Sequence, residues 1–227
     1  MLKHIAVSAL ALGLFSPAFA DSSLHNDQSR VRRSNQVFQE IMQTPDKGIP
    51  REILEGAQCV AIIPGEKKIA LGFGGTYGKG IATCRNGRAW SAPMFIQIGG
   101  GSWGLQLGGQ STDLIMVFRT QAGLIHLLRD KVKIGAGASA AAGPIGREST
   151  ASTDATMHAE ILTYSRSRGA FAGISLSGEI VQPDRSGDRA MYGRSTWQNI
   201  LAGKISAPVS TRPFLATMNR YSAKASL

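Results

Sequence analysis

Residues 59–118 read CVAIIPGEKKIALGFGGTYGKGIATCRNGRAWSAPMFIQIGGGSWGLQLGGQSTDLIMVF. Short apolar runs alternate there with glycines and small polar residues, without the spacing of three to four residues that marks a helix face. Alternation with a period of two, bounded by Gly, Asn and Pro, is typical of strands and hairpins. We therefore expect an α+β fold. Its centre should be a curved, largely antiparallel, glycine-rich, barrel-like β-sheet, with short helices at the N- and C-terminal ends of the chain.

Four strands are expected at the start of this stretch, joined in a simple up-and-down order: residues 59–63, 69–75, 79–84 and 89–98. The Asn86-Gly87 pair predicts a hairpin between the last two, because such a turn needs residues that accept positive φ. In this order the first and third connections lie at the same end of the sheet. They would bring together four basic residues: Lys67, Lys68, Arg85 and Arg88. Four separately solvated turn residues are the alternative.

The charge of the chain is strongly one-signed. It has 25 basic and 15 acidic residues and a formal net charge of +10, and no acidic residue lies between Glu66 and Asp113. A basic excess of this size indicates an anionic partner such as nucleic acid, a membrane surface or an acidic polymer. The alternative is that the charge only keeps the protein soluble.

The first 20 residues have the pattern of a secretory signal peptide. Lys3 gives a positive start, residues 5–15 are apolar, and Ala18-Phe19-Ala20 is a small-x-small cleavage site before Asp21. We expect residues 21–227 to form one exported domain, in the periplasm or secreted. Export argues against nucleic acid as a partner.

Residues 24–43 are the first helix expected in the mature chain. Leu24, Val31 and Phe38 repeat every seven residues, and three arginines lie beside them: Arg30, Arg32 and Arg33. An apolar stripe flanked by arginines can lie in a lipid interface. The alternative is that the stripe packs on the sheet.

The chain has two cysteines, Cys59 and Cys84. An even number in an exported protein predicts a disulfide, here closing a loop of about 25 residues. The simple strand order conflicts with this bond, because it places the two cysteines at opposite ends of strands that are not neighbours. A disulfide needs Cα atoms within about 7 Å. We favour the disulfide over the strand order.

No catalytic, metal or cofactor site is expected. Residues 100–104 match the G-x-S-x-G elbow around Ser102, but the residues that follow alternate like a strand rather than opening a helix. Residues 135–140 echo a dinucleotide fingerprint without the βαβ unit that it requires. Only three histidines follow the signal peptide, and they are scattered: His25, His126 and His158. These do not make a metal ligand set.

Several blocks of the sequence, taken in order, resemble the SYLF domain over roughly residues 36–215. They are Ile49-Pro50, Trp90-Ser91-Ala92-Pro93, residues 98–107, Ser111-Thr112-Asp113-Leu114, Gly143-Pro144-Ile145-Gly146-Arg147, residues 164–176, Met191-Tyr192-Gly193 and residues 200–203.

The resemblance implies a lipid-binding domain. Eukaryotic SYLF proteins bind phosphoinositides, some of them through a basic amphipathic N-terminal helix, and some bind actin beside an SH3 domain. This chain differs in its signal-peptide pattern and has no SH3-like segment. The resemblance therefore implies a surface for anionic phospholipid, with Arg30, Arg32, Arg33 and Phe38 at the position of the family's lipid-binding helix. A peripherally membrane-associated, non-enzymatic protein is expected. An envelope scaffold for an unknown protein partner is the alternative.

Overall fold

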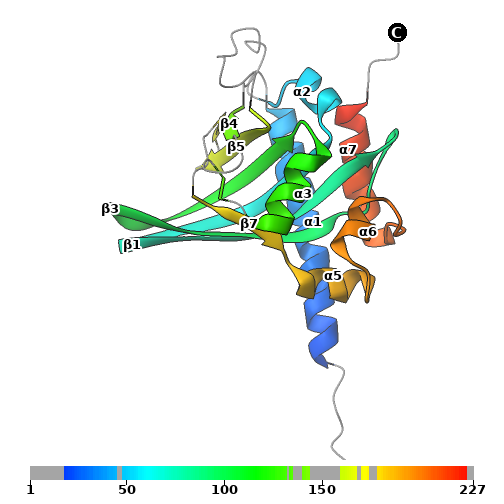
Figure 1. The fold of residues 1–227 in the computed structure, drawn as a ribbon, viewed down its shortest axis with the longest axis horizontal. Helices are drawn as coiled ribbons and strands as arrows, with labels where there is room; N and C mark the ends of the chain where they lie inside the picture. The colour runs from blue at the N-terminus through cyan, green and yellow to red at the C-terminus, as the bar shows by residue number, and fades with distance from the viewer. Residues whose placement is uncertain are drawn as a thin grey trace, which may run out of the picture.

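Figure 1 shows the computed structural model of the protein, which describes residues 18–44, 48–131, 133–134, 140–143, 159–167, 170–173 and 178–223. The helices are α1 (Ala18–Gln43), α2 (Arg51–Gly56), α3 (Gln121–Asp130), α5 (Arg185–Tyr192), α6 (Trp197–Leu201), the 3-10 turn η2 (Val209–Thr211) and α7 (Arg212–Ser222). The strands are β1 (Cys59–Asn86), β2 (Ala89–Trp90), β3 (Met94–Phe118), β4 (Ala140–Ala142), β5 (Ile161–Ser167), β6 (Ala170–Gly173) and β7 (Ile180–Pro183).

The strands form one curled, half-barrel sheet in the order β2-β1-β3-β5-β4, with β6 paired to β5 and β7 paired to β3. All of its pairs are antiparallel except β4 with β5. Its main component is a long ribbon of β1 and β3, which extends to one side of the molecule in Figure 1. The α+β fold with a curved, largely antiparallel sheet is confirmed.

The expected division of residues 59–84 into three strands is wrong, because β1 runs without interruption through both proposed turns. At the first turn the register against β3 shifts between Ile63 and Glu66, and Gly65 has a φ of +63°. One extra residue in β1 therefore makes a β-bulge, which bends a strand without ending it. The hairpin after Asn86 is confirmed: Asn86 pairs with Ala89, and Gly87 has a φ of +63°.

Close approach, rather than a turn, explains the glycines near residue 78. A Cβ on Gly78 would lie 2.6 Å from the side chain of Ile63, and one on Gly80 would lie 2.8 Å from the Cα of Ile63. The two halves of β1 therefore cross each other at short range. This crossing brings Cys59 to Cys84, whose Cα atoms are 4.0 Å apart and whose sulfurs form the expected disulfide.

Helices cover both faces of the sheet. On one face α1 contributes Val31, Phe38 and Ile41 to a core with Val60 and Ile62 of β1. On the other face α3 packs against the residues that alternate with them, including Ala61 and Ile63. Figure 1 shows α1 and α3 on opposite sides of the strands. The start of β1, residues 59–63, is therefore buried on both faces, which explains why its apolar residues form a continuous run.

Residues 185–192 form α5, which is capped by Asp184. The signal peptide stays a prediction, since residues 1–17 lie outside the described residues and α1 begins at Ala18. Within the described ranges, the helices are all too short or too polar to cross a lipid bilayer.

Candidate functional site

Of the three arginines predicted to bind lipid on α1, Arg32 and Arg33 are exposed and Arg30 is buried. The Arg30 guanidinium lies 2.9 Å from a carboxylate oxygen of Asp27 and 2.9 Å from one of Asp184. It also lies 5.0 Å from the centre of the Phe95 ring. Arg30 therefore joins α1 to the start of α5 and is buried rather than exposed at the surface of α1.

Phe38, the aromatic residue predicted to contact lipid, is fully buried. Its ring packs edge-on against Tyr221 of α7, with 6.2 Å between the ring centres. The apolar stripe of α1 therefore packs on the sheet, which was the alternative interpretation. The outward face of α1 keeps Arg32 and Arg33 in solvent.

Lys67, Lys68, Arg85 and Arg88 were expected to converge from two neighbouring turns. The first of these turns does not exist, because β1 continues through it. Lys67 is exposed and lies opposite Ser111 within the ribbon, and Lys68 lies opposite Gln110, but its side chain is outside the described residues. The bulge at Gly65 replaces the turn that was expected to carry both lysines toward the Asn86 hairpin.

Arg85 is a structural residue. Its guanidinium donates to the carbonyl oxygens of Leu54, Ala57 and Ser222 at 3.0–3.1 Å, and it lies 4.6 Å from the centre of the Trp90 ring. Arg88, three residues on in the hairpin, is exposed. Of this pair only Arg88 is fully exposed, and Arg85 is half-buried.

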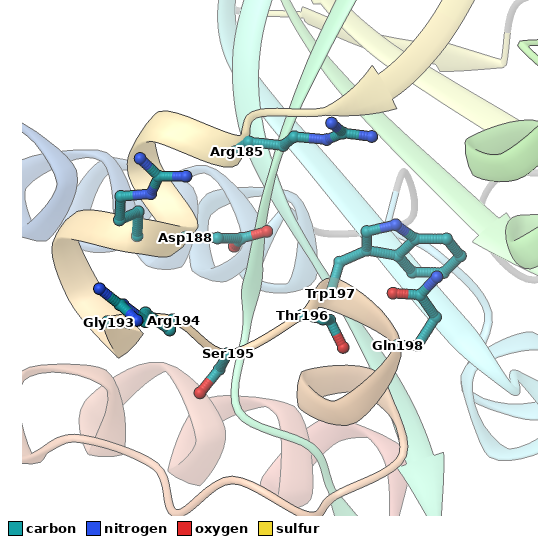
Figure 2. A pocket seen from close by; sticks show the side chains of 9 residues that line it. Arg185, Asp188, Gly193, Arg194, Ser195, Thr196, Trp197 and Gln198 are labelled. Atoms are coloured by element: carbon teal, nitrogen blue, oxygen red, sulfur yellow. The ribbon is translucent and has the colours of Figure 1, made fainter.

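The structure brings together a different set of basic side chains, which the sequence interpretation missed. An open cleft of about 790 Å³ lies between α5, the turn after it and the start of α6. Figure 2 shows it, and its lining includes Arg185, Asp188, Arg189, Arg194, Trp197 and Gln198. A second cleft of about 590 Å³ shares Arg185, Trp197 and Gln198 and adds Lys79, Arg129 and Lys131. We call the two together the basic cleft.

Local sequence explains how α5 presents its arginines. The Asp184 side chain accepts from the backbone N–H of Gly187 and so caps the helix. Arg185 and Arg189 are four residues apart, which places them on one helix face. An acidic N-cap after Pro183 was the signal that could have identified this helix.

The two acidic residues next to the cleft, Asp184 and Asp188, are bonded to other groups of the protein. Burial opposes the ionisation of Asp184, yet hydrogen bonds from Ser186, Lys79 and Arg30 outweigh it and hold the pKa of Asp184 below its ordinary value. Asp188 accepts from the backbone N–H of Phe95 at 2.7 Å. Burial raises the pKa of Asp188 to about 7, and the nearby carboxylates of Asp184 and Asp27 add to the rise.

Four basic groups of the cleft remain without such partners. Within the described part of the chain, no ion pair or hydrogen bond joins the side chains of Arg185, Arg189, Arg194 or Lys131 to another protein group. Lys79 is 2.9 Å from Asp184, and Arg129 is 2.9 Å from Asp130. Arg185, Arg189 and Arg194 line the first cleft, and Arg185 and Lys131 line the second, so each cleft has side chains that can donate hydrogen bonds to an external anion.

Ser102 has no elbow around it: it lies within β3, opposite Gly74 of β1. Searching the described residues for three or more neighbouring His, Cys, Asp or Glu side chains that could hold a metal finds no such group.

Comparison with known proteins identifies the family. Residues 99–221 match the Ysc84 family, described as "Las17-binding protein actin regulator". The chain is 30% identical over 215 residues to an SH3 domain-containing protein of Schizosaccharomyces pombe, covering 92% of this chain and 49% of that protein. It is 33% identical over 191 residues to LAS seventeen-binding protein 3 of Saccharomyces cerevisiae, covering 82% and 40%. It is 29% identical over 210 residues to SH3 domain-containing YSC84-like protein 1 of Xenopus laevis, covering 88% and 62%.

The chain thus spans about half the length of these curated relatives. Their names describe binding and actin-regulating proteins, not enzymes. The resemblance noted from the sequence blocks is confirmed, and this chain belongs to the Ysc84, or SYLF domain, family.

Proposed function

We propose that the protein is a non-enzymatic binding protein that associates reversibly with anionic phospholipid through exposed basic side chains. The observation that supports this most directly is the group of cations in the basic cleft that have no ion-pair partner among the described residues: Arg185, Arg189, Arg194 and Lys131. Each Lys or Arg held near an anionic leaflet contributes about 1 kcal/mol. Several acting together support binding in the micromolar range, even after losses to ordering.

Helix α1 contributes charge in this proposal rather than an inserted apolar face. Its side chains Val31, Phe38 and Ile41 pack in the core, so inserting them in lipid would expose the sheet to water. Arg32 and Arg33 lie on the outward face and can meet phosphate groups directly. Attraction between exposed charges is screened over about 8 Å at physiological salt. Binding should therefore weaken as salt rises.

We further propose that the protein acts at the cell envelope, exported to the periplasm or secreted, and bound peripherally to membrane. The signal-peptide pattern of residues 1–20 supports this. The Cys59–Cys84 disulfide supports it too, because disulfides persist in oxidising compartments. Cell fractionation together with the intact mass of the recovered protein tests the proposal. A mature chain starting at Asp21 is the expected result, and cytosolic protein that keeps Met1 would contradict it.

Liposome co-sedimentation tests the lipid proposal. Vesicles with rising phosphatidylglycerol and cardiolipin content should bind increasing amounts of protein, and neutral vesicles should bind little. Arg185→Glu with Arg189→Glu should weaken binding more than the control pair Arg51→Glu with Arg220→Glu, which changes the net charge equally with exposed residues of α2 and α7. Equal binding to neutral and anionic vesicles, or binding to neither, would refute the proposal.

A protein-partner scaffold is the second candidate, because relatives are named for binding Las17 and for carrying SH3 domains. Chemical crosslinking in intact cells followed by mass spectrometry distinguishes the two candidates. A stoichiometric protein partner that persists after charge reversal at Arg185 and Arg189 would favour the scaffold. Loss of all crosslinks together with loss of vesicle binding would favour lipid.

A further inference from the structure

Helix α5 is joined to the rest of the fold through a buried group of charges. Three carboxylates lie there, and each residue is 4% exposed: Asp27 of α1, Asp184 at the N-cap of α5 and Asp188 within α5. Two cations face them. Arg30 lies 2.9 Å from both Asp27 and Asp184, and Lys79 of β1 lies 2.9 Å from Asp184. We call these five side chains the α5 charge cluster.

Asp188 is the acid of this cluster that has no cation of its own. Its carboxyl group accepts from the backbone N–H of Phe95 at 2.7 Å. Among the residues that the structure describes, no Lys, Arg or His side chain forms an ion pair with it. A protonated carboxyl group keeps an oxygen that can accept from an amide. The contact with Phe95 therefore does not require a charge on Asp188.

The charges of the cluster balance only when one of its carboxyl groups is protonated. With all three ionised, three negative charges face two positive ones, and an unpaired charge is left in a buried place at a high cost in free energy. Asp27 and Asp184 share the two cations, so the proton belongs on Asp188. Burial raises the pKa of Asp188 to about 7, and the carboxylates of Asp184 and Asp27 add to the rise, against the opposing effects of the Phe95 N–H and Arg30.

The other groups around Asp188 do not balance its charge within the cluster. Tyr192 of α5 donates to the carbonyl oxygen of Pro93, and burial raises its pKa, so it stays neutral. Three exposed cations line the same open cleft as Asp188, as Figure 2 shows for two of them: Arg185, Arg189 and Arg194. An ionised Asp188 is therefore more stable turned toward this cleft and its water than in the cluster.

The first turn of α5 fits closely against α1 and β3. A Cβ on Gly187 would lie 2.9 Å from the Cβ of Phe95 and 3.3 Å from a carboxylate oxygen of Asp27. The backbone N–H of Asp184 donates to the carbonyl oxygen of Phe95 at 2.9 Å. Water drawn to a charged Asp188 would have to displace this turn, because the contact leaves no space for it.

We propose that the α5 charge cluster is a proton-dependent latch: protonated Asp188 holds α5 against α1 and β3, and ionisation of Asp188 releases the first turn of α5. A proton bound more tightly in the closed form favours that form at acidic pH, so the latch opens as the pH rises. Because α5 carries Arg185 and Arg189, opening moves two cations of the basic cleft. Only this consequence for binding rests on the proposed function.

Hydrogen exchange of the full mature protein at pH 5.5 and pH 8 tests the latch. Protection factors are compared, because they remove the intrinsic pH dependence of amide exchange. Residues 185–192 should lose about tenfold more protection at pH 8 than residues 114–118 of the buried sheet, since each pKa unit between the closed and open forms is a factor of ten. Equal losses in the two segments would indicate a general loss of stability and would overturn the latch.

Asp188→Asn has nearly the same shape and cannot ionise, so its α5 should stay protected at pH 8. Asp27→Asn removes one negative charge beside Asp188 and should make the protection of α5 depend less on pH. Glu52→Gln, at an exposed residue of α2, is the control and should respond to pH as the wild type does. An Asp188→Asn protein whose α5 opens at pH 8 like that of the wild type would contradict the proposal.

Carboxyl-carbon NMR of the wild type gives a measurement that needs no variant. Asp188 should titrate near neutral pH, together with shifts of the amide signals of residues 185–189. Titration of Asp188 near pH 4, or titration near pH 7 without a change in these amide signals, would show that α5 is not governed by this proton.

Vesicle binding at pH 6 and pH 8 measures the consequence for the basic cleft. Phosphatidylglycerol is used because its phosphodiester keeps the same charge over this range. Wild type should lose more affinity at pH 8 than Asp188→Asn does, and the comparison removes the effect of the histidines, which both proteins share. Equal losses would show that the latch does not control binding. If no vesicle binds at either pH, the proposed function fails, and hydrogen exchange alone decides whether the latch exists.

Discussion

The guanidinium group of Arg85 contacts three carbonyl oxygens from two separate segments: Leu54 of α2 and its C-cap Ala57, and Ser222 at the end of α7. Its stacking on Trp90 fixes the plane of the group. In the sequence, Arg85 and Arg88 are equivalent members of one basic turn. In the structure Arg85 packs against α2 and α7, whereas Arg88 stays exposed to solvent.

Arg85→Lys should therefore lower the free energy of unfolding by roughly 2–3 kcal/mol, because a single ammonium nitrogen cannot occupy the separate positions of the Nε and Nη2 donors. Arg88→Lys, in the same hairpin but exposed, should leave stability within about 0.5 kcal/mol of the wild type. Urea unfolding followed by circular dichroism measures both variants. Similar losses for the two would show that the Arg85 contacts contribute little.

Asp188 should make stability depend on pH. Its pKa is raised from 3.8 to about 7 by burial, so the folded chain keeps a proton that the unfolded chain has lost between these values. The stabilisation is complete below the unfolded pKa and disappears as the pH rises through the folded pKa. At about 1.4 kcal/mol per pKa unit, the loss amounts to roughly 4 kcal/mol.

Asp188→Asn removes this charge but keeps an oxygen that can accept from the N–H of Phe95. The variant should be more stable than the wild type at pH 8, and the difference should shrink toward pH 4. Urea unfolding at pH 4.5, 6 and 8 measures this. Parallel pH profiles for wild type and variant would contradict the assignment.

At the scale of elements, the crossing of β1 over itself shapes the sheet. The bulge at Gly65 bends the strand, and the small residues Gly78 and Gly80 let its second half pass close to Ile62 and Ile63. The same ribbon places its apolar residues on both faces, under α1 and under α3. The helices can cover these faces only because the ribbon is curled.

Gly80→Ala should cost about 3 kcal/mol or more, because the added Cβ would overlap the carbonyl oxygen of Ile62, a backbone atom that cannot rotate away. Gly75→Ala is the matched control in the same strand, since a Cβ there has no neighbouring atom within 4 Å. Thermal unfolding of both variants gives the comparison. A well-folded Gly80→Ala protein with the wild-type midpoint would show that the two halves of β1 do not cross this closely.

At the scale of the whole molecule, the Cys59–Cys84 disulfide closes the large loop that contains most of β1, with a sequence separation of 25 between the two cysteines. Reduction should lower the free energy of unfolding by about 3 kcal/mol in the chain-entropy model. Urea unfolding with and without reductant measures the loss. A Cys59→Ala, Cys84→Ala variant should not respond to reductant, and two freely alkylated thiols in unreduced protein would contradict the bond.

The sequence alone was enough to predict those features that depend on neighbouring residues. Alternation of apolar and small residues predicted the strands, and the Asn86-Gly87 pair predicted the hairpin. The seven-residue repeat that includes Phe38 predicted the first helix, and the even number of cysteines predicted the disulfide. The ordered motif blocks identified the family. Each of these depends on local backbone preference, on short-range pattern or on the number of a residue type, and the chain carries that information without its fold.

Only the tertiary structure decided which cations are available to a ligand. Arg30 is buried because Asp184, 154 residues away, lies beside it, and Arg85 is half-buried because α7 returns to the hairpin. The bulge at Gly65 was mistaken for a turn because the pairing with β3, rather than the local sequence, keeps the strand continuous. Likewise, Arg185 and Lys131 share a cleft only after α3 and α5 are packed. Burial and charge pairing between distant residues depend on the complete packing, and short-range sequence pattern does not contain them.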